Sequence, residues 1–289
     1  MQTAPWMVFP YLVYLYPLGL GVGYTLLFIM GLLLHIAAFW AFISKRDSWT
    51  DTHIYMCNLA LADSILILFL PFRIYDDFQG LPITYLCTFL FMVHYLNMYA
   101  SILTTAAVSV HRYLAVRFPM HISSWRRKKQ TAVVVCLLIW GLLLTLCVIF
   151  RKINYPDKLC ACYERDNKEQ LHLNIVLLLI LLGYVLPLLI LVFCSSQIIY
   201  ILLKHNGTTE EKKGIIGIVT ANLVVFVVCY TPINVAYIVN NIVARNLQDI
   251  HVHKLADRYL QVSEWIASAN CCFDSISYYF LLKHFYSQQ

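Results

Sequence analysis

Oxygen-bearing side chains occur in the middle of long apolar stretches, where a charged group is costly. The clearest is Asp63, which lies in the run LALADSILILFL. A lone carboxylate in such surroundings must face other protein groups, water or a cation. Four further side chains could complete an oxygen-rich pocket of the kind that hard cations such as Na⁺ prefer, namely Asn97, Ser101, Asn270 and Asp274. Two interpretations fit these residues: a sodium site, or a protonated Asp63 in a hydrogen-bond network that holds no ion.

The sequence contains none of the motifs that carry common enzyme chemistry. A glycine-rich phosphate loop, an HExxH zinc motif and a GxSxG nucleophile elbow are all absent. There is also no internal repeat of broken helices, as in many transporters, and no repeated charged ring, as in many channels. We therefore expect a binding protein rather than an enzyme, with no cofactor other than a bound sodium ion.

The elements that position these residues are membrane-spanning helices. Of the 289 residues, 61% are apolar and only 12% are charged, and the mean hydropathy is +0.69. A helix rises about 1.5 Å per residue, so about 20 apolar residues cross the hydrocarbon core of a bilayer. Seven stretches are long enough, at residues 11–43, 53–75, 85–116, 131–150, 172–203, 215–243 and 255–282. Because the spacers are too short for another domain, we predict an all-α membrane protein in which residues 1–289 form one seven-transmembrane helix bundle.

The orientation follows from the basic residues, which are enriched in cytoplasmic loops. Arg126, Arg127, Lys128 and Lys129 lie between the third and fourth spans, in a loop without an acidic residue. That side should face the cytoplasm, which places the N-terminus outside the plasma membrane and the C-terminus inside. The formal net charge of +6 is explained by such loops and by an anionic ligand, so we expect no nucleic-acid partner.

The cysteines divide into two groups. Of the ten, seven fall inside predicted spans, where a thiol behaves as a small buried hydrophobe. The other three, Cys87, Cys160 and Cys162, lie at the predicted outer face, which is an oxidising compartment. We expect Cys87 to form a disulfide with Cys160 or Cys162, and we favour Cys162.

Motifs in most of the spans occur in a characteristic order. The sequence has LALAD in the second span, Cys87 at the start of the third, HRYLAVRFP at its end, Trp140 in the fourth, Pro187 in the fifth, FVVCYTP in the sixth and DSISYYF in the seventh. In this combination the chain resembles a rhodopsin-type (class A) G-protein-coupled receptor. Within that class it resembles the branch of receptors 35 and 55 and of the lysophospholipid and nucleotide receptors.

The resemblance implies that the two ends of the bundle have different functions. A receptor of this class binds its ligand at the outer face and activates a heterotrimeric G protein at the inner face. Residues 283–289 would begin a short amphipathic helix on the membrane surface. The positions implied for G-protein coupling are His111, Arg112, Tyr113, Pro119, Met120, Lys212 and Tyr278.

Two aromatic residues in the sixth span are candidates for a conformational switch. Pro232 permits a bend in this helix. Phe226 and Tyr230 lie one turn apart on the same face, as a packing switch requires and as plain core aromatics also do.

Three positions depart from the pattern of the class. His111 stands where an acid usually precedes the arginine, His35 stands where asparagine is usual, and Ser275 replaces a common proline. An acid beside Arg112 would hold its guanidinium in the resting state, and neutral His111 supplies no such charge. We predict raised ligand-independent signalling, because losing a contact specific to the inactive state shifts the population. The alternatives are that other packing contacts hold the resting state, or that the chain is a non-signalling scavenger or decoy receptor.

The outer ligand cavity is expected to be basic. Arginine forks recognise carboxylate and phosphate well, and His94 stands where amine receptors of the class carry an aspartate. An anionic ligand is therefore favoured, either an aromatic carboxylic acid or a lysophospholipid, while each basic residue alone also fits an anchor for membrane lipids. The residues predicted to bind the ligand are Arg73, His94, Tyr95, Met98, Tyr99, Arg151, Lys152, Asn234, Tyr237, Arg258, Gln261 and Glu264.

Overall fold

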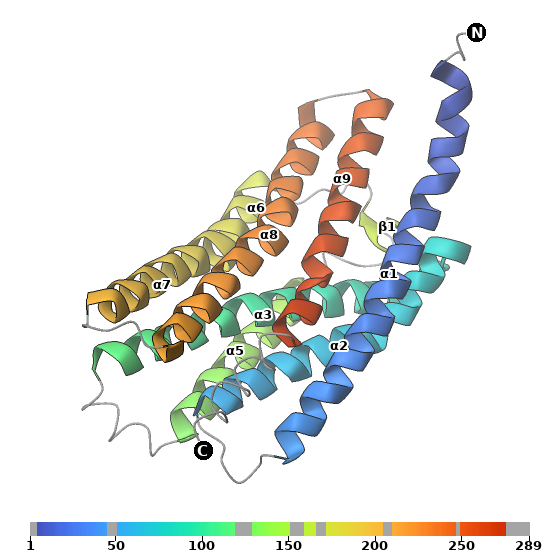
Figure 1. The fold of residues 1–289 in the computed structure, drawn as a ribbon. Helices are drawn as coiled ribbons and strands as arrows, with labels where there is room; N and C mark the ends of the chain where they lie inside the picture. The colour runs from blue at the N-terminus through green and yellow to red at the C-terminus, as the bar shows by residue number, and fades with distance from the viewer. Residues whose placement is uncertain are drawn as a thin grey trace.

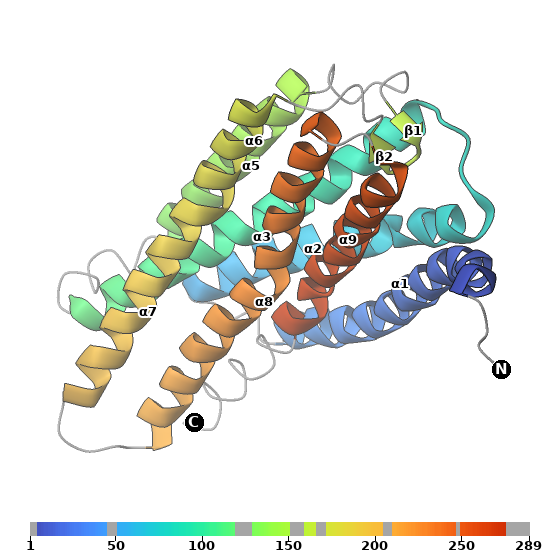
Figure 2. The ribbon, with the colours of Figure 1, turned by 90° about the horizontal axis from the view of Figure 1, so that it is seen from above.

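The chain folds into a bundle of long helices that lie alongside one another (Figures 1 and 2). The computed structural model describes residues 5–44, 51–118, 129–150, 159–165, 172–204, 210–246 and 249–275. The first four helices are α1 (Pro5–Ser44), α2 (Asp51–Gln79), α3 (Tyr85–Arg117) and α5 (Lys129–Phe150). The fifth rod of the bundle is continuous through α6 (Leu173–Ile180), the π-helical turn η5 (Leu181–Val185) and α7 (Leu186–Lys204). The sixth is α8 (Glu210–Asn246) and the seventh is α9 (Ile250–Ser268). The predicted seven-helix bundle is thereby confirmed.

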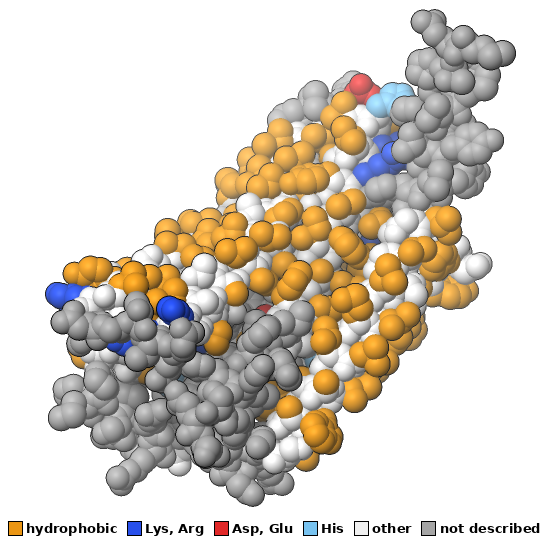
Figure 3. Space-filling model, in the orientation of Figure 1, with side chains coloured by type: hydrophobic (Ala, Val, Ile, Leu, Met, Phe, Trp, Pro, Cys, Tyr) orange, Lys and Arg blue, Asp and Glu red, His pale blue; other side chains and the backbone are white. Residues whose placement is uncertain are grey.

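The surface of the bundle matches a membrane environment. Among the described residues, six of the seven rods are long and apolar enough to cross a bilayer, with α6, η5 and α7 counted as one. Hydrophobic side chains cover the middle of the face seen in Figure 3, and most charged side chains in view lie towards its two ends. The seventh rod, α9, is more polar because it carries residues such as Asp257, Arg258 and Glu264, and it packs chiefly against α8.

The seventh helix begins earlier than the sequence indicates and is interrupted. The predicted span started at residue 255, whereas α9 starts at Ile250. Asp249 sets this start, because its side-chain oxygen accepts a hydrogen bond from the backbone N–H of His251 at 2.8 Å. After Ser268 a turn at Ala269 leads into further helix over residues 270–275. This second part carries the amide and carboxylate that point toward α3.

A polar link inside the bundle joins three helices. Trp140 of α5 donates its indole N–H to Asn58 Oδ1 of α2 at 2.7 Å, and Asn58 Nδ2 donates to Thr104 Oγ1 of α3 at 2.9 Å. Small buried residues, Ala62 and Ala100, allow these helices to approach closely. Trp140 therefore joins α5 to α2 through a hydrogen bond, in addition to its packing contacts.

The π-helical turn in the fifth rod has a local cause. Pro187 has no backbone N–H, so the carbonyl of Gly183 lacks its usual helical partner. The widened turn from Leu181 to Val185 includes this glycine. A Cβ atom on Gly183 would overlap the ring of Tyr99, with Cδ1 of that ring 3.1 Å away. The fifth rod thus lies close to α3 at this level.

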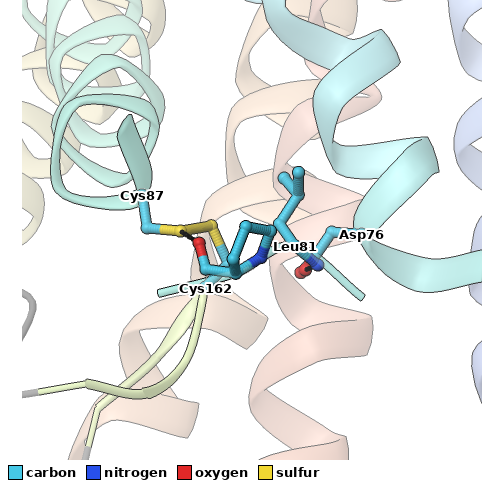
Figure 4. Close-up of a disulfide and its surroundings, with 5 residues drawn as sticks. Asp76, Leu81, Cys87 and Cys162 are labelled. Atoms are coloured by element: carbon cyan, nitrogen blue, oxygen red, sulfur yellow. Dashed lines mark hydrogen bonds between the residues drawn. A yellow bond between two sulfur atoms is a disulfide. The ribbon is translucent and has the colours of Figure 1, made fainter. Parts of the chain in front are cut away.

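A short hairpin covers the N-terminal end of α3, which the basic loops predict to face outward. Strands β1 (Leu159–Ala161) and β2 (Glu164–Arg165) pair antiparallel. Figure 4 shows the disulfide that ties this hairpin to α3, between Cys87 and Cys162, with an S–S distance of 2.08 Å. Of the two partners considered for Cys87, the structure joins Cys162 and leaves Cys160 exposed.

Candidate functional site

A cavity lies beneath the hairpin, between α1, α2, α3 and α9. Its polar lining consists of Tyr24 from α1, Arg73 from α2, His94 from α3, Tyr163 from the hairpin and Glu264 from α9. The apolar lining consists of Leu66, Phe69, Leu70, Leu90 and Val93. We call this space the outer cavity. It brings together three of the residues predicted to bind a ligand, namely Arg73, His94 and Glu264.

Arg73 is the central group of the outer cavity. It is 6% exposed, and its guanidinium carbon lies 4.2 Å from the centre of the Tyr163 ring and 5.4 Å from that of Tyr24. Two carboxylates approach it: Asp77 Oδ1 lies 3.8 Å from Nε, and Glu264 Oε2 lies 4.0 Å from Nη2. Both distances exceed hydrogen-bond length. Within the described part of the chain, the Arg73 Nε–H has no hydrogen-bond partner.

A second acid lies beside Arg73. We expected positive groups to dominate against one clear acid, Glu264, whereas Asp77 is a second acid beside Arg73. Asp77 follows Arg73 by four residues on α2, and that spacing places two side chains on the same helix face. The spacing of four residues between Arg73 and Asp77 could therefore have indicated their contact from the sequence. Burial raises the pKa of the Tyr163 phenol in the hairpin, so this ring stays neutral above Arg73.

The remaining predicted ligand residues form a second group nearer to α8. The rings of Tyr95 and Tyr237 stack with centres 5.9 Å apart, and Tyr99 lies against Gly183. Met98 is 4% exposed and belongs to the hydrophobic core between α3, α7 and α8. Asn234 donates its side-chain N–H to the backbone carbonyl of Tyr230, one turn earlier in α8, at 2.7 Å.

Several predicted ligand residues do not line the outer cavity. Arg258 and Gln261 are half-buried on α9 and are not among its lining residues. Arg151 and Lys152 lie outside the described residues. Arg73 is therefore the one arginine or lysine among the described residues that line this cavity.

The oxygen-bearing residues in the middle of the bundle do come together. Asp274 Oδ2 accepts hydrogen bonds from Asn270 Nδ2 at 2.6 Å and from Ser101 Oγ at 3.2 Å. Asn97 Nδ2 lies 3.5 Å from Asp63 Oδ1. The second oxygen, Asp63 Oδ2, has no hydrogen-bond partner among the described residues. We call these five residues the polar centre.

His35 and Ser275, which both depart from the class pattern, lie next to the polar centre. His35 Nε2 lies 3.9 Å from Asp63 Oδ2, and His35 Nδ1 lies 3.1 Å from Ser275 Oγ. Neither residue was assigned to this set from the sequence. Among the described residues, His, Cys, Asp and Glu side chains form no group of three spaced for a metal ion. A cation here would therefore depend on hydroxyl and amide oxygens as well as on the two carboxylates.

An inner cavity connects the polar centre with the inner end of α3. Its lining includes Asn270 and Asp274 at one end and Arg112 at the other, with Thr105, Asn222 and Tyr230 between apolar side chains. No ion pair joins Arg112 to a described residue. A guanidinium therefore faces the interior of the bundle on the side opposite to the outer cavity.

The other residues implied for G-protein coupling lie at this inner end or beyond the described chain. The His111 ring lies 5.7 Å from that of Tyr55, and the Tyr113 ring lies 5.7 Å from that of Phe193. Lys212 is half-buried near the start of α8. Pro119, Met120 and Tyr278 lie outside the described residues, as do residues 283–289.

The candidate switch residues lie in the core between the two cavities. Phe226 and Tyr230 are each 2% exposed, and their ring centres are 5.2 Å apart. Phe226 also stacks on Tyr184 of the π-helical turn, at 6.0 Å. The Tyr184 hydroxyl is hydrogen-bonded to Thr231 Oγ1 at 2.6 Å. Pro232 follows inside α8.

Over the described residues, the bundle has seven helices, an outer cavity, a buried polar centre and an arginine at the inner end of the third helix. This is the architecture of a transmembrane receptor. The sequence matches the family described as 7 transmembrane receptor (rhodopsin family) over residues 35–278. The chain therefore belongs to this family, whose members are receptors and not enzymes.

Among its relatives are receptors of the branch that the motifs indicated. The chain is 33% identical to mouse (Mus musculus) G-protein coupled receptor 35, over 90% of this chain and 84% of the relative. It is 30% identical to human (Homo sapiens) G-protein coupled receptor 55, over 89% and 83%. It is 28% identical to mouse lysophosphatidic acid receptor 4, over 92% and 75%. The resemblance to this branch is confirmed.

Proposed function

We propose that this protein is a plasma-membrane receptor that binds an acid-bearing small molecule or lysophospholipid in its outer cavity and activates heterotrimeric G proteins. Its N-terminus is extracellular and its C-terminus cytoplasmic. The observation that carries the ligand proposal is Arg73. It is buried, Tyr24 and Tyr163 cover it, and its nearest carboxylate oxygens lie at 3.8 and 4.0 Å. A phosphate or carboxylate that entered the cavity would form charge-assisted hydrogen bonds with the N–H groups of the Arg73 guanidinium.

The relatives support the same class of ligand. One of them is named for lysophosphatidic acid, whose glycerol backbone carries one phosphate and one acyl chain. The apolar half of the outer cavity, formed by residues such as Phe69 and Leu70, suits the apolar part of such a molecule.

The test measures nucleotide exchange on a panel of Gα proteins in the presence of oleoyl lysophosphatidate or naphthoate. We expect Arg73→Ala to weaken the potency of whichever probe is active by about 10- to 100-fold, as for the loss of hydrogen bonds to a charged group. Arg245→Ala is the matched control, because Arg245 is exposed at the end of α8 and does not line the outer cavity. Full potency in Arg73→Ala would contradict the proposed site.

We also propose that the receptor signals without ligand. His111, which precedes Arg112 in the sequence, packs its ring against that of Tyr55. No described residue forms an ion pair with Arg112. We expect His111→Asp to lower basal nucleotide exchange several-fold, because a charge-assisted contact would favour the resting state. Basal exchange equal to that of receptor-free membranes, at matched expression, would contradict this proposal.

The competing function is a scavenger or decoy that binds ligand without signalling. His111 and Ser275 favour it, because both depart from positions associated with signalling in this class. Probe binding to purified receptor without nucleotide exchange on any Gα would support the decoy.

A further inference from the structure

The described charged residues in and next to the outer cavity carry more negative than positive charge. Arg73 supplies one positive charge, while Asp77 and Glu264 supply two negative charges within 4.0 Å of it. The side chains are 7%, 9% and 6% exposed, respectively, so water screens them weakly. Of these three residues, Arg73 and Glu264 line the cavity and Asp77 lies next to Arg73; apart from Arg73, Glu264 and His94, the described lining residues are aromatic or aliphatic. The formal charge of this buried cluster is therefore −1.

A ligand with an acid alone binds Arg73 but adds negative charge to this cluster. One further negative charge would bring the buried total to −2, and like charges in a site of low dielectric repel strongly. A ligand with a base alone fits this cluster poorly. It would lie against the Arg73 guanidinium and would leave the Nε–H of that group without an acceptor.

A ligand with both groups satisfies both halves of the cluster. On the premise that this protein is the receptor proposed above, we propose that the outer cavity recognises a zwitterion, whose phosphate or carboxylate binds Arg73 and whose ammonium group binds Glu264. The buried charge then stays at −1. Glu264 lines the same cavity as Arg73, and its Oε2 lies 4.0 Å from Arg73 Nη2, so the acid and the base of one headgroup can reach these two side chains together.

The aromatic residues of the cavity suit an ammonium group as well. Tyr24, Phe69 and Tyr163 line the same space, and aromatic faces attract cations. Tyr163 already contacts the Arg73 guanidinium in this way. The ring is held in place because its neighbour Cys162 is bonded to α3.

The test uses purified full-length receptor and three probes that share one oleoyl chain. Lysophosphatidylethanolamine carries a phosphate and an ammonium group, its N-acetyl derivative keeps the phosphate but loses the positive charge, and lysophosphatidate carries the phosphate alone. Affinity is measured by competition against the labelled ethanolamine lipid. We expect N-acetylation to weaken binding about tenfold or more, the size of one charge-assisted contact.

Glu264→Gln separates recognition of the base from recognition of the acid. This variant should reduce the advantage of the ethanolamine lipid over its N-acetyl derivative to about threefold or less, while Arg73→Gln should weaken all three probes. Asp249→Asn is the control, because it removes an acid at the outer end of α9, which asparagine also caps well. In this control the ratio of the affinities for the ethanolamine lipid and its N-acetyl derivative should equal that of the wild type.

Three outcomes would overturn the inference. The first is equal or tighter binding of the N-acetyl derivative to the wild type, a result that needs no variant to fold. The second is a loss of affinity in Glu264→Gln that is the same for all three probes. The third is no binding of any probe to the wild type. Failure of the proposed function would look different, as preferential binding of the ethanolamine lipid without nucleotide exchange on any Gα.

Discussion

The disulfide between Cys87 and Cys162 gives a prediction whose size follows from the chain. It joins residues 75 positions apart. In the chain-entropy treatment, closing a loop of this length stabilises the folded state by about 4.5 kcal/mol at 25 °C. Much of that loop is helix that stays inserted in the membrane or detergent when the receptor unfolds, so the real denatured state is already restricted. We expect Cys162→Ser to cost about 2–3 kcal/mol.

Thermal unfolding of purified receptor measures this cost. A loss of about 2–3 kcal/mol corresponds to a fall in Tm of roughly 4–10 °C for a domain of this size. Cys160→Ser is the matched control, because the same chemical change is made two residues away at an exposed cysteine outside the disulfide. That variant should melt within about 1 °C of the wild type. Cys162→Ser should also weaken probe binding, since Tyr163 would lose its position over Arg73.

A double variant sharpens the result. If one disulfide accounts for the loss, Cys87→Ser combined with Cys162→Ser should melt at the same temperature as Cys162→Ser alone. Two results would refute the reasoning: a wild-type Tm for Cys162→Ser, or an equal fall in Tm for Cys160→Ser.

Three further predictions concern the interior of the bundle. Sodium chloride in place of choline chloride should raise the Tm of the wild type by about 2–5 °C and leave that of Asp63→Asn unchanged, because a bound ion stabilises only the folded state. Gly183→Ala should destabilise the receptor by about 1–3 kcal/mol, since its Cβ would overlap the Tyr99 ring; a Tyr99→Leu change made in that background should restore part of the Tm. Trp140→Phe should cost about 1–3 kcal/mol in thermal unfolding, because it leaves Asn58 Oδ1 without its donor.

The fold was predictable because its determinants are local in sequence. Each span is a run of apolar residues long enough to cross a bilayer, and only helices satisfy their own backbone hydrogen bonds there. The start of α9 was less predictable. A capping bond from Asp249 outweighs the fall in hydropathy, so the helix begins before the apolar run does.

The polar centre was predictable in part, and the charge of the outer cavity was not. Buried polar groups in a membrane must find one another, so Asp63 and Asp274 could be grouped from composition alone. Asp77 was overlooked because it lies near the outer end of α2, where an acid ordinarily meets water. The structure shows that it faces Arg73 and is largely buried. Burial of a residue at a helix end depends on what covers it, here a hairpin whose position follows from a disulfide.

The departures from the class pattern are not equivalent, and only their positions in space reveal this. His35 and Ser275 are 240 residues apart in sequence, yet their side chains are 3.1 Å apart. Ser275 also donates to the carbonyl of Cys271, at 3.0 Å. These two side chains therefore join α1 to the seventh rod. The change at His111 differs, because no described residue forms an ion pair with the neighbouring Arg112. We therefore propose that basal signalling depends on the surroundings of Arg112 and not on the contact between His35 and Ser275.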